Sequence, residues 1–114
     1  MDLGGSEKGI FFIIDIAGKI DRLKDSIVLK SYINTLMEKG YVNIALNLSK
    51  VTYLDSGALN VLIYGHDALT RKNGRLAIIE PSEFVRDVMD VAGLSKVAKI
   101  YSTMEEFNHA LKNG

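Results

Sequence analysis

Apolar and polar residues alternate along residues 42–49, which is the two-residue period of a β-strand. Apolar residues then recur at three- and four-residue intervals, the period of an amphipathic helix. These later residues are Leu59, Leu62, Ile63 and Leu69. Residues 51–59 are therefore predicted to form a strand-to-helix junction. Either Asp55 or Ser56 is expected to be the N-cap, because its side-chain oxygen can accept a free backbone N–H of the first turn.

The same two periods recur along the chain and predict alternating strands and helices. Strands are expected at 10–16, 42–49, 75–79 and 97–100. The first helix is expected to be capped by Asp21, Asp25 or Ser26 and to end at Gly40. The second is expected from the junction to Lys72, and the third from Pro81 to Gly93. The last helix is expected to follow Ser102 or Thr103, either of which can form a capping box. Gly18 is expected to end the first strand. The buried stripe predicted for the third helix consists of Phe84, Val85, Val88, Met89 and Ala92.

This alternation predicts an α/β fold with a mostly parallel sheet of about four to five strands and about four helices. The 114 residues are expected to form a single domain, 1–114. Residues 1–9 carry three glycines, so they are expected to be a loose segment or a short edge strand.

Charge and composition narrow the classes of function. Fourteen basic and fourteen acidic residues balance, without long runs of one sign, which argues against a nucleic-acid or membrane partner. The absence of cysteine excludes disulfides, thiol nucleophiles and cysteine-based metal sites. The apolar run 10–14 is too short to span a membrane and has no signal-peptide pattern, so a cytoplasmic location is expected.

Ser56 is the leading candidate for chemistry, but a serine nucleophile needs a base. His66 lies ten residues along the same predicted helix, about 15 Å away, and His109 lies in the terminal helix without a recognisable partner. The sequence Asp55-Ser56-Gly57 also lacks the first glycine of a hydrolase nucleophile elbow. From spacing alone, a role for Ser56 in helix capping is favoured over catalysis.

Two other groups of residues have a functional and a simpler structural interpretation. Asp15, Asp21 and Asp55 can converge near strand ends and bind magnesium, although capping and solvation explain them more simply. Aromatic residues can form an exposed contact patch or belong to the core. These residues are Tyr53, Tyr64 and Phe84. Glycine-rich phosphate loops are absent, so no nucleotide or other cofactor is expected.

The junction also resembles a known family. Asn47-Leu48-Ser49 followed by Tyr53-Leu54-Asp55-Ser56-Gly57-Ala58-Leu59 is similar to the signature of the STAS domain family, and more narrowly to that of bacterial anti-sigma factor antagonists. Residues 18–21 resemble the family's Gly-x-Leu-Asp, and residues 80–94 resemble its third-helix segment. The resemblance covers about residues 9–111.

This resemblance implies a regulatory protein that binds other proteins and is a kinase substrate rather than an enzyme, so no catalytic or metal-binding residues are expected. In the family, the residue at the place of Ser56 is phosphorylated by an ATP-dependent anti-sigma factor that is a serine kinase. The unmodified form binds this kinase and frees the sigma factor, phosphorylation stops the binding, and a phosphatase resets the switch. By the same matching, Asp55 orients the acceptor hydroxyl and Asp21 contributes to the partner-facing surface.

The partner is expected along the start and exposed ridge of the second helix. The predicted partner-binding residues are Asp21, Asp55, Ser56, Gly57, Asn60 and Tyr64, with Asp67 farther along the ridge. Many family members have a second hydroxyl residue and then glycine where this chain has Gly57 and Ala58. Two alternatives remain: a STAS scaffold or transport-associated subunit that is never phosphorylated, and a small metal-dependent enzyme that uses Asp55 and Ser56.

Overall fold

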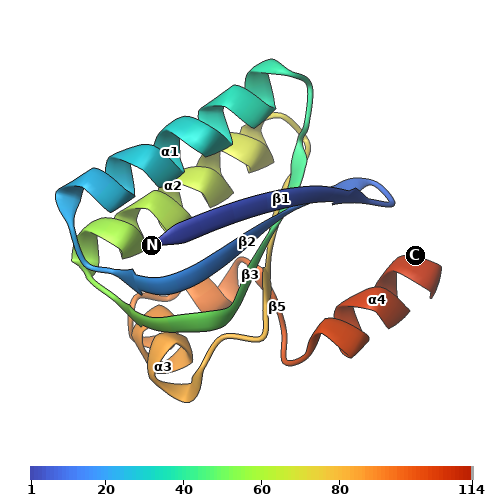
Figure 1. The fold of residues 1–114 in the computed structure, drawn as a ribbon. Helices are drawn as coiled ribbons and strands as arrows, with labels where there is room; N and C mark the ends of the chain where they lie inside the picture. Colours follow the sequence, from blue (N-terminus) through green and yellow to red (C-terminus); the bar gives the residue numbers. More distant parts are fainter. Residues whose placement is uncertain (114) are drawn as a thin grey trace.

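The computed structural model describes residues 1–113, which form five β-strands, four α-helices and one short 3₁₀ helix, η1 (Figure 1). In chain order these are β1 (Asp2–Lys8), β2 (Phe11–Ile20), α1 (Leu23–Glu38), β3 (Asn43–Leu54), α2 (Ser56–Arg71), β4 (Arg75–Ile79), α3 (Glu83–Val91), η1 (Leu94–Lys96), β5 (Lys99–Tyr101) and α4 (Met104–Asn113). The predicted α/β class and the approximate numbers of strands and helices are confirmed. Among these residues no helix is both long and apolar enough to cross a membrane; the longest, α1 and α2, have 16 residues each.

The strands form one sheet in the order β1-β2-β3-β4-β5. β1 pairs antiparallel with β2, and the remaining neighbours pair in parallel. Residues 2–8 are therefore the edge strand of the sheet. The Tyr41 hydroxyl, beyond the end of α1, donates a hydrogen bond to Oε1 of Glu7 on this strand.

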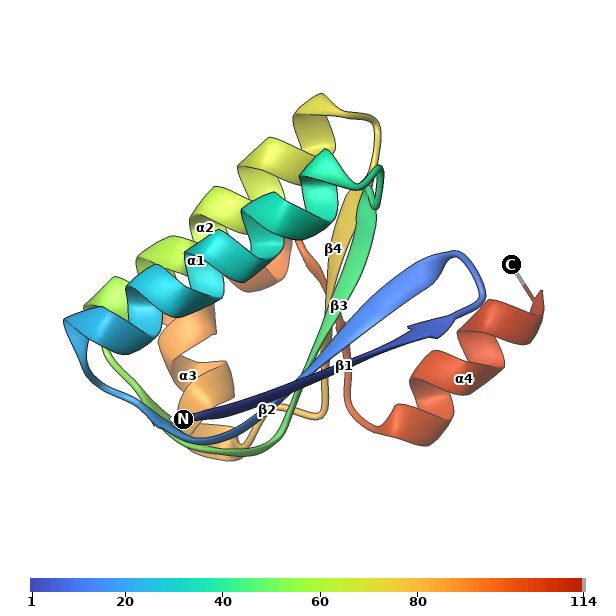
Figure 2. The same ribbon diagram turned by 45° about the horizontal axis from the view of Figure 1, so that its top comes forward.

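Helices cover the two faces of the sheet unequally: α1, α2 and α3 lie on one side and α4 lies on the other (Figure 2). The two-residue period of the strands explains how both faces become apolar. Ile14, Leu46 and Ile78 are in register on neighbouring strands and point into the larger core under α1, α2 and α3. The residues one position earlier in each strand face α4 and surround the fully buried Phe107. These residues are Ile13, Ala45 and Ala77.

Two expectations for the first part of the chain are wrong. Gly18 does not end β2; it has φ 95° and lies at a register shift, and the strand continues because buried Ile20 still pairs with Leu54. None of the expected acidic or serine caps starts α1, since its N-cap is Arg22, which makes no side-chain capping bond. Ser26 is instead buried within the helix.

The predicted third helix also needs correction. α3 begins at Glu83 rather than at Pro81, because the Ser82 hydroxyl accepts the Val85 N–H at 3.2 Å and acts as the cap. Phe84 is 48% exposed, so it does not belong to the buried stripe. A helix of nine residues presents only one narrow face to the sheet, and its fully buried residues are Val85 and Met89. At α4 the capping residue is Thr103, whose hydroxyl accepts the Glu106 N–H at 3.0 Å.

Candidate functional site

The junction between β3 and α2 places a serine hydroxyl at the start of a long helix. Leu54 ends the strand with its side chain in the core, and the backbone of Asp55 is extended. Oδ1 of Asp55 accepts the Ala58 N–H at 2.8 Å, so Asp55 is the N-cap, as one of the two predicted alternatives. Ser56 is consequently the first residue of α2 and is exposed. Its hydroxyl lies at the positive end of the helix dipole.

Asp21 lies beside this junction because the two strand ends are paired. Ile20 and Leu54 are register partners, and the Asp55 N–H donates to the Ile20 carbonyl at 3.0 Å. The next residue, Asp21, is exposed. The carboxyl groups of Asp21 and Asp55 and the Ser56 hydroxyl therefore follow the carboxyl ends of two neighbouring strands, β2 and β3.

Asp15 does not join them, so the three aspartates considered as an alternative magnesium site do not converge. It lies five residues before Ile20 in the extended strand β2, and its Oδ1 accepts a hydrogen bond from Nδ2 of Asn47 at 2.7 Å. At about 3.3 Å per residue this places Asp15 roughly 16 Å from the strand end. Within residues 1–113, no group of three histidine, aspartate or glutamate side chains is arranged to hold a metal ion.

Gly57, the residue after Ser56, contacts the first turns of α1. A Cβ atom at this position would lie 3.2 Å from Oγ of Ser26 and 3.3 Å from Oδ1 of Asp55. Oγ of Ser26 is buried and has no hydrogen-bond partner among the described residues. The absence of a side chain at residue 57 therefore leaves room for a buried hydroxyl and for the carboxylate that caps α2. Ser26 was predicted only as one of three possible caps of α1, and its approach to residue 57 is visible only in the folded structure.

The predicted exposed ridge of α2 holds at three of its four positions. Ser56, Asn60 and Asp67 are exposed, but Tyr64 is partly buried against α1. Its hydroxyl donates to Oδ1 of Asn34, and the Lys30 ammonium lies 4.4 Å from its ring centroid. Eight residues of helix turn Tyr64 about 80° away from Ser56, which explains why it faces α1.

Two of the three aromatic residues for which a contact patch and a core role were both left open form an exposed pair. The rings of Tyr53 and Phe84 are stacked, with centroids 5.4 Å apart and planes inclined by 19°. They are 40% and 48% exposed. Tyr64 belongs to the α1–α2 contact instead. This patch lies beside the junction, since Tyr53 is two residues before Asp55.

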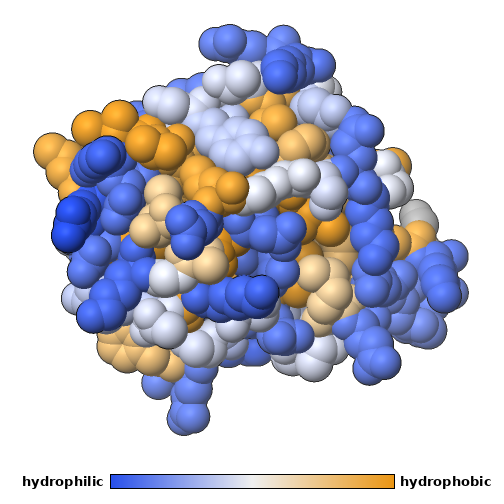
Figure 3. Space-filling model, in the orientation of Figure 1, coloured by the Kyte–Doolittle hydropathy of each residue, from blue (hydrophilic) through white to orange (hydrophobic). Residues whose placement is uncertain are grey.

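Apolar side chains are also exposed on the α1 side of the junction. Leu23 and Ile27 lie in the first turns of α1 and are 77% and 56% exposed. Apolar atoms gather on the surface over this end of α1, at the left of Figure 3. Ser26 in the same turns contacts the start of α2. Ser56 is therefore flanked by exposed apolar groups on both α1 and α3, which is typical of a protein-binding surface.

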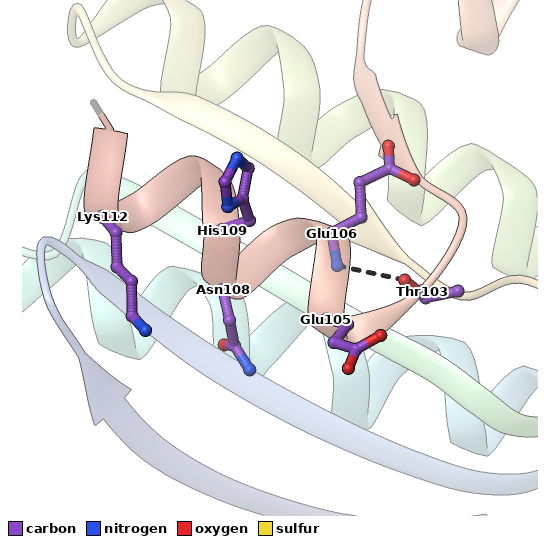
Figure 4. A pocket seen from close by; sticks show the side chains of 6 residues that line it. All are labelled: Thr103, Glu105, Glu106, Asn108, His109 and Lys112. Atoms are coloured by element: carbon purple, nitrogen blue, oxygen red, sulfur yellow. Dashed lines mark hydrogen bonds between the residues drawn. The ribbon is translucent and has the colours of Figure 1, made fainter.

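Both histidines lie away from Ser56. His66 is ten residues along α2. His109 lies on α4, on the opposite face of the sheet, where its Nε2 is 2.9 Å from Nδ2 of Asn113. It contributes to a hollow whose lining side chains all come from α4 and the residue before it (Figure 4). This hollow is a depression on one helix and does not reach the junction.

Comparisons with known proteins identify the type of domain. Residues 6–107 match the family model described as STAS domain. A Thermotoga maritima protein that carries the provisional name anti-sigma factor antagonist is 34% identical over 70 residues. The alignment covers 61% of this chain and 62% of that relative, so the chain matches a little under two thirds of the relative's length.

Solved structures share the whole architecture. The crystal structure of a Thermotoga maritima protein, also provisionally described as an anti-sigma factor antagonist, has a TM-score of 0.88 with 23% identity and covers 96% of this chain and 94% of its own. The Bacillus protein SpoIIAA, described as an anti-sigma factor antagonist, matches in its unphosphorylated form with a TM-score of 0.79, 17% identity and 99% coverage of both chains. Its phosphorylated form matches with a TM-score of 0.75, 18% identity and coverage of 96% and 99%. At these identities the structures establish the fold.

Proposed function

The chain belongs to the STAS domain family, and we propose from this premise that it is an anti-sigma factor antagonist switched by phosphorylation of Ser56. The unmodified form binds a cognate anti-sigma factor and so frees a sigma factor, and the modified form does not bind. The observation that carries the proposal is the exposed Ser56 hydroxyl at the first position of α2, beside the capping carboxylate of Asp55.

The fold is suited to accept a phosphoryl group at this position. Phosphorylation adds about −1.5 to −2 charges at pH 7, and a helix N-terminus stabilises negative charge through its dipole and free N–H groups. Ser56 is exposed, so the group stays in water and no core residue has to move. The relative SpoIIAA, which has the same fold, is described in both an unphosphorylated and a phosphorylated form.

The same charge is unfavourable once a partner covers the junction. A phosphoryl dianion that loses its water without meeting a cation costs several kcal/mol. A cost of about 3 kcal/mol would weaken binding roughly a hundredfold. The exposed apolar groups on both sides of Ser56 mean that a bound partner would exclude water there. Modification can therefore control binding without any change in the fold.

The proposed partners are an anti-sigma factor that is a serine kinase and a phosphatase that acts on phosphorylated Ser56. The kinase is proposed to contact Asp21, Asp55, Ser56, Gly57 and Asn60. Tyr64 is proposed to contribute only through its exposed edge, because its hydroxyl is bonded to Asn34. The chain itself is proposed to be a substrate rather than an enzyme, since neither histidine can reach Ser56 as a base.

The test is incubation of the chain with the anti-sigma kinase of the source cell and ATP, followed by intact mass measurement. The wild-type chain is expected to gain one phosphate, whereas Ser56→Ala gains none. Ser31→Ala is the matched control, because Ser31 is also an exposed helical serine but lies in α1. Phosphate on the Ser56→Ala chain would contradict the site. Partner binding without any phosphate uptake would favour a STAS scaffold, and ATP hydrolysis by the chain alone would favour an enzyme.

A further inference from the structure

A groove between α2 and α3 lies next to the junction and is almost entirely apolar. It is lined by Leu59, Phe84, Asp87, Val88, Val91 and Ala92 and has a volume of about 490 Å³. We call it the α2–α3 groove. Phe84, Val88 and Val91 are spaced by four and three residues, so they form a stripe along α3. Phe84 and Val91 face outward, and Val88 is half-buried against the larger core. Val91 is 90% exposed.

Phe84 and Val91 are not needed to hold α3 on the sheet. The inward side of the helix already buries Val85 and Met89 completely. Phe84 is held in place from outside the core, by the stacked ring of Tyr53. An exposed aromatic ring with a fixed position loses little conformational freedom on binding, which favours a contact role.

The charges beside the stripe have one sign. Glu83, Asp87 and Asp90 are exposed on α3, and Asp87 lines the groove itself. The single basic residue of α3 is Arg86, and its Nη1 is 3.4 Å from Oγ of Ser102, on the side toward β5. A ligand of the groove therefore meets apolar side chains in the middle and carboxylates at the edge.

We infer that the α2–α3 groove docks an amphipathic helix of the anti-sigma partner, with apolar residues on its inner side and lysine or arginine at its edges. This inference rests on the proposed function and identifies the partner element that the chain binds beyond Ser56. Helix-in-groove binding places apolar residues at three- and four-residue spacing against such a stripe. A second copy of the chain fits less well, because it would bring its own Glu83, Asp87 and Asp90 against the same acidic edge.

The groove is continuous with the phosphorylation site. Leu59 in the groove is one helical turn from Ser56, and Tyr53, stacked on Phe84, is two residues from Asp55. A helix in the groove would thus lead the partner's catalytic part toward the Ser56 hydroxyl. Docking and modification nevertheless involve different side chains, so they can be separated by substitution.

The experiment measures binding of the anti-sigma kinase to chains in which Ser56 is already Ala, without ATP. Phe84→Ala and Val91→Ala are each expected to weaken binding at least tenfold, while Ile10→Ala, a 64% exposed apolar residue in the β1–β2 turn, leaves it unchanged. Asp87→Lys is expected to weaken binding and to reduce its dependence on salt, whereas Glu38→Lys at the far end of α1 has little effect. Circular dichroism of each variant verifies the fold.

The outcomes separate this inference from the switch at Ser56. Unchanged binding by both Phe84→Ala and Val91→Ala would overturn the docking groove, even if Ser56 is phosphorylated normally. Loss of binding in these variants would support it, even if no phosphate is ever found on Ser56. Self-association of the wild-type chain that disappears in Phe84→Ala would assign the groove to a second copy instead. Failure of the kinase to bind the unmodified chain at all would overturn both proposals.

Discussion

Substitution of Gly57 by alanine tests the packing at the proposed phosphorylation site. The new Cβ would lie 3.2 Å from Oγ of Ser26 and 3.3 Å from Oδ1 of Asp55, both closer than an ordinary contact of 3.4–4 Å. Overpacking of this kind costs about 1–3 kcal/mol, and disturbance of the Asp55 cap adds to it. Replacing glycine within a helix returns up to about 1 kcal/mol. We therefore expect Gly57→Ala to lower the free energy of unfolding by about 1 kcal/mol, or the Tm by about 4 °C.

Two further variants make this expectation specific. Ser26→Ala alone should be nearly neutral, because Oγ of Ser26 has no hydrogen-bond partner to lose. Combined with Gly57→Ala it should restore most of the lost stability, giving a coupling of about 1 kcal/mol. Gly65→Ala is the matched control in the same helix, because its Cβ would be 3.6 Å from the nearest atom, and it should stabilise.

The assay is urea denaturation of the four chains and the control, followed by far-UV circular dichroism. Additivity of Ser26→Ala and Gly57→Ala within about 0.5 kcal/mol would refute the proposed contact. Stabilisation by Gly57→Ala in the wild-type background would refute it as well. Either result would mean that a Cβ atom at this position fits without displacing Ser26.

The remaining predictions concern the cap, the second core and the edge strand. Asp55→Ala should lower the free energy of unfolding by about 1 kcal/mol in thermal melts, while Asp55→Asn should retain most of it, since both aspartate and asparagine cap helices. Phe107→Ala removes a fully buried ring packed edge-to-face on Phe11 and Tyr101 and should cost about 3–5 kcal/mol in urea, and a loss under 1 kcal/mol would contradict the importance of the α4 core. The hydrogen bond to Glu7 raises the pKa of Tyr41, with burial and the Glu7 charge adding to the effect, so the folded state keeps this phenol neutral above its ordinary pKa of 10. The resulting stability is present below pH 10 and is lost as pH rises through the raised pKa; alkaline unfolding of Tyr41→Phe should therefore depend less on pH.

The spacing of apolar residues predicted most of the strands and helices, because this spacing depends on which face of each element is buried. The alternation at 42–49 and the helical spacing after Leu59 both follow from burial of one face, and β3 and α2 are where these patterns are clearest. Strand β4 has the predicted bounds, since Asn73-Gly74 precedes it and the sheet buries four of its five residues. Thr103 caps α4 through the expected local hydrogen bond.

The errors concern features that depend on residues distant in the sequence. Gly18 resembles a strand end, but pairing of the following residues with β3 carries β2 to Ile20. Phe84 resembles a core residue, although the sheet has room for only one face of α3 and the ring stacks on Tyr53 instead. At the candidate site, the Asp55 cap and the exposed Ser56 followed from the sequence. The contact between Ser26 and Gly57 did not, because thirty residues separate two side-chain positions that only the fold brings together.

Because α4 is the one described helix on its side of the sheet, it is a suitable site for attaching a label or a surface. Because the chain has no cysteine, Lys112→Cys would introduce a single thiol at an exposed position of α4. A fluorophore or surface linker joined to this thiol would lie across the sheet from α1, α2 and α3 (Figure 2). Immobilised in this way, the protein would keep its entire opposite face accessible to proteins in solution. Surface-based binding measurements can then use a single orientation of the molecule, with the chemistry of attachment remote from the helix starts.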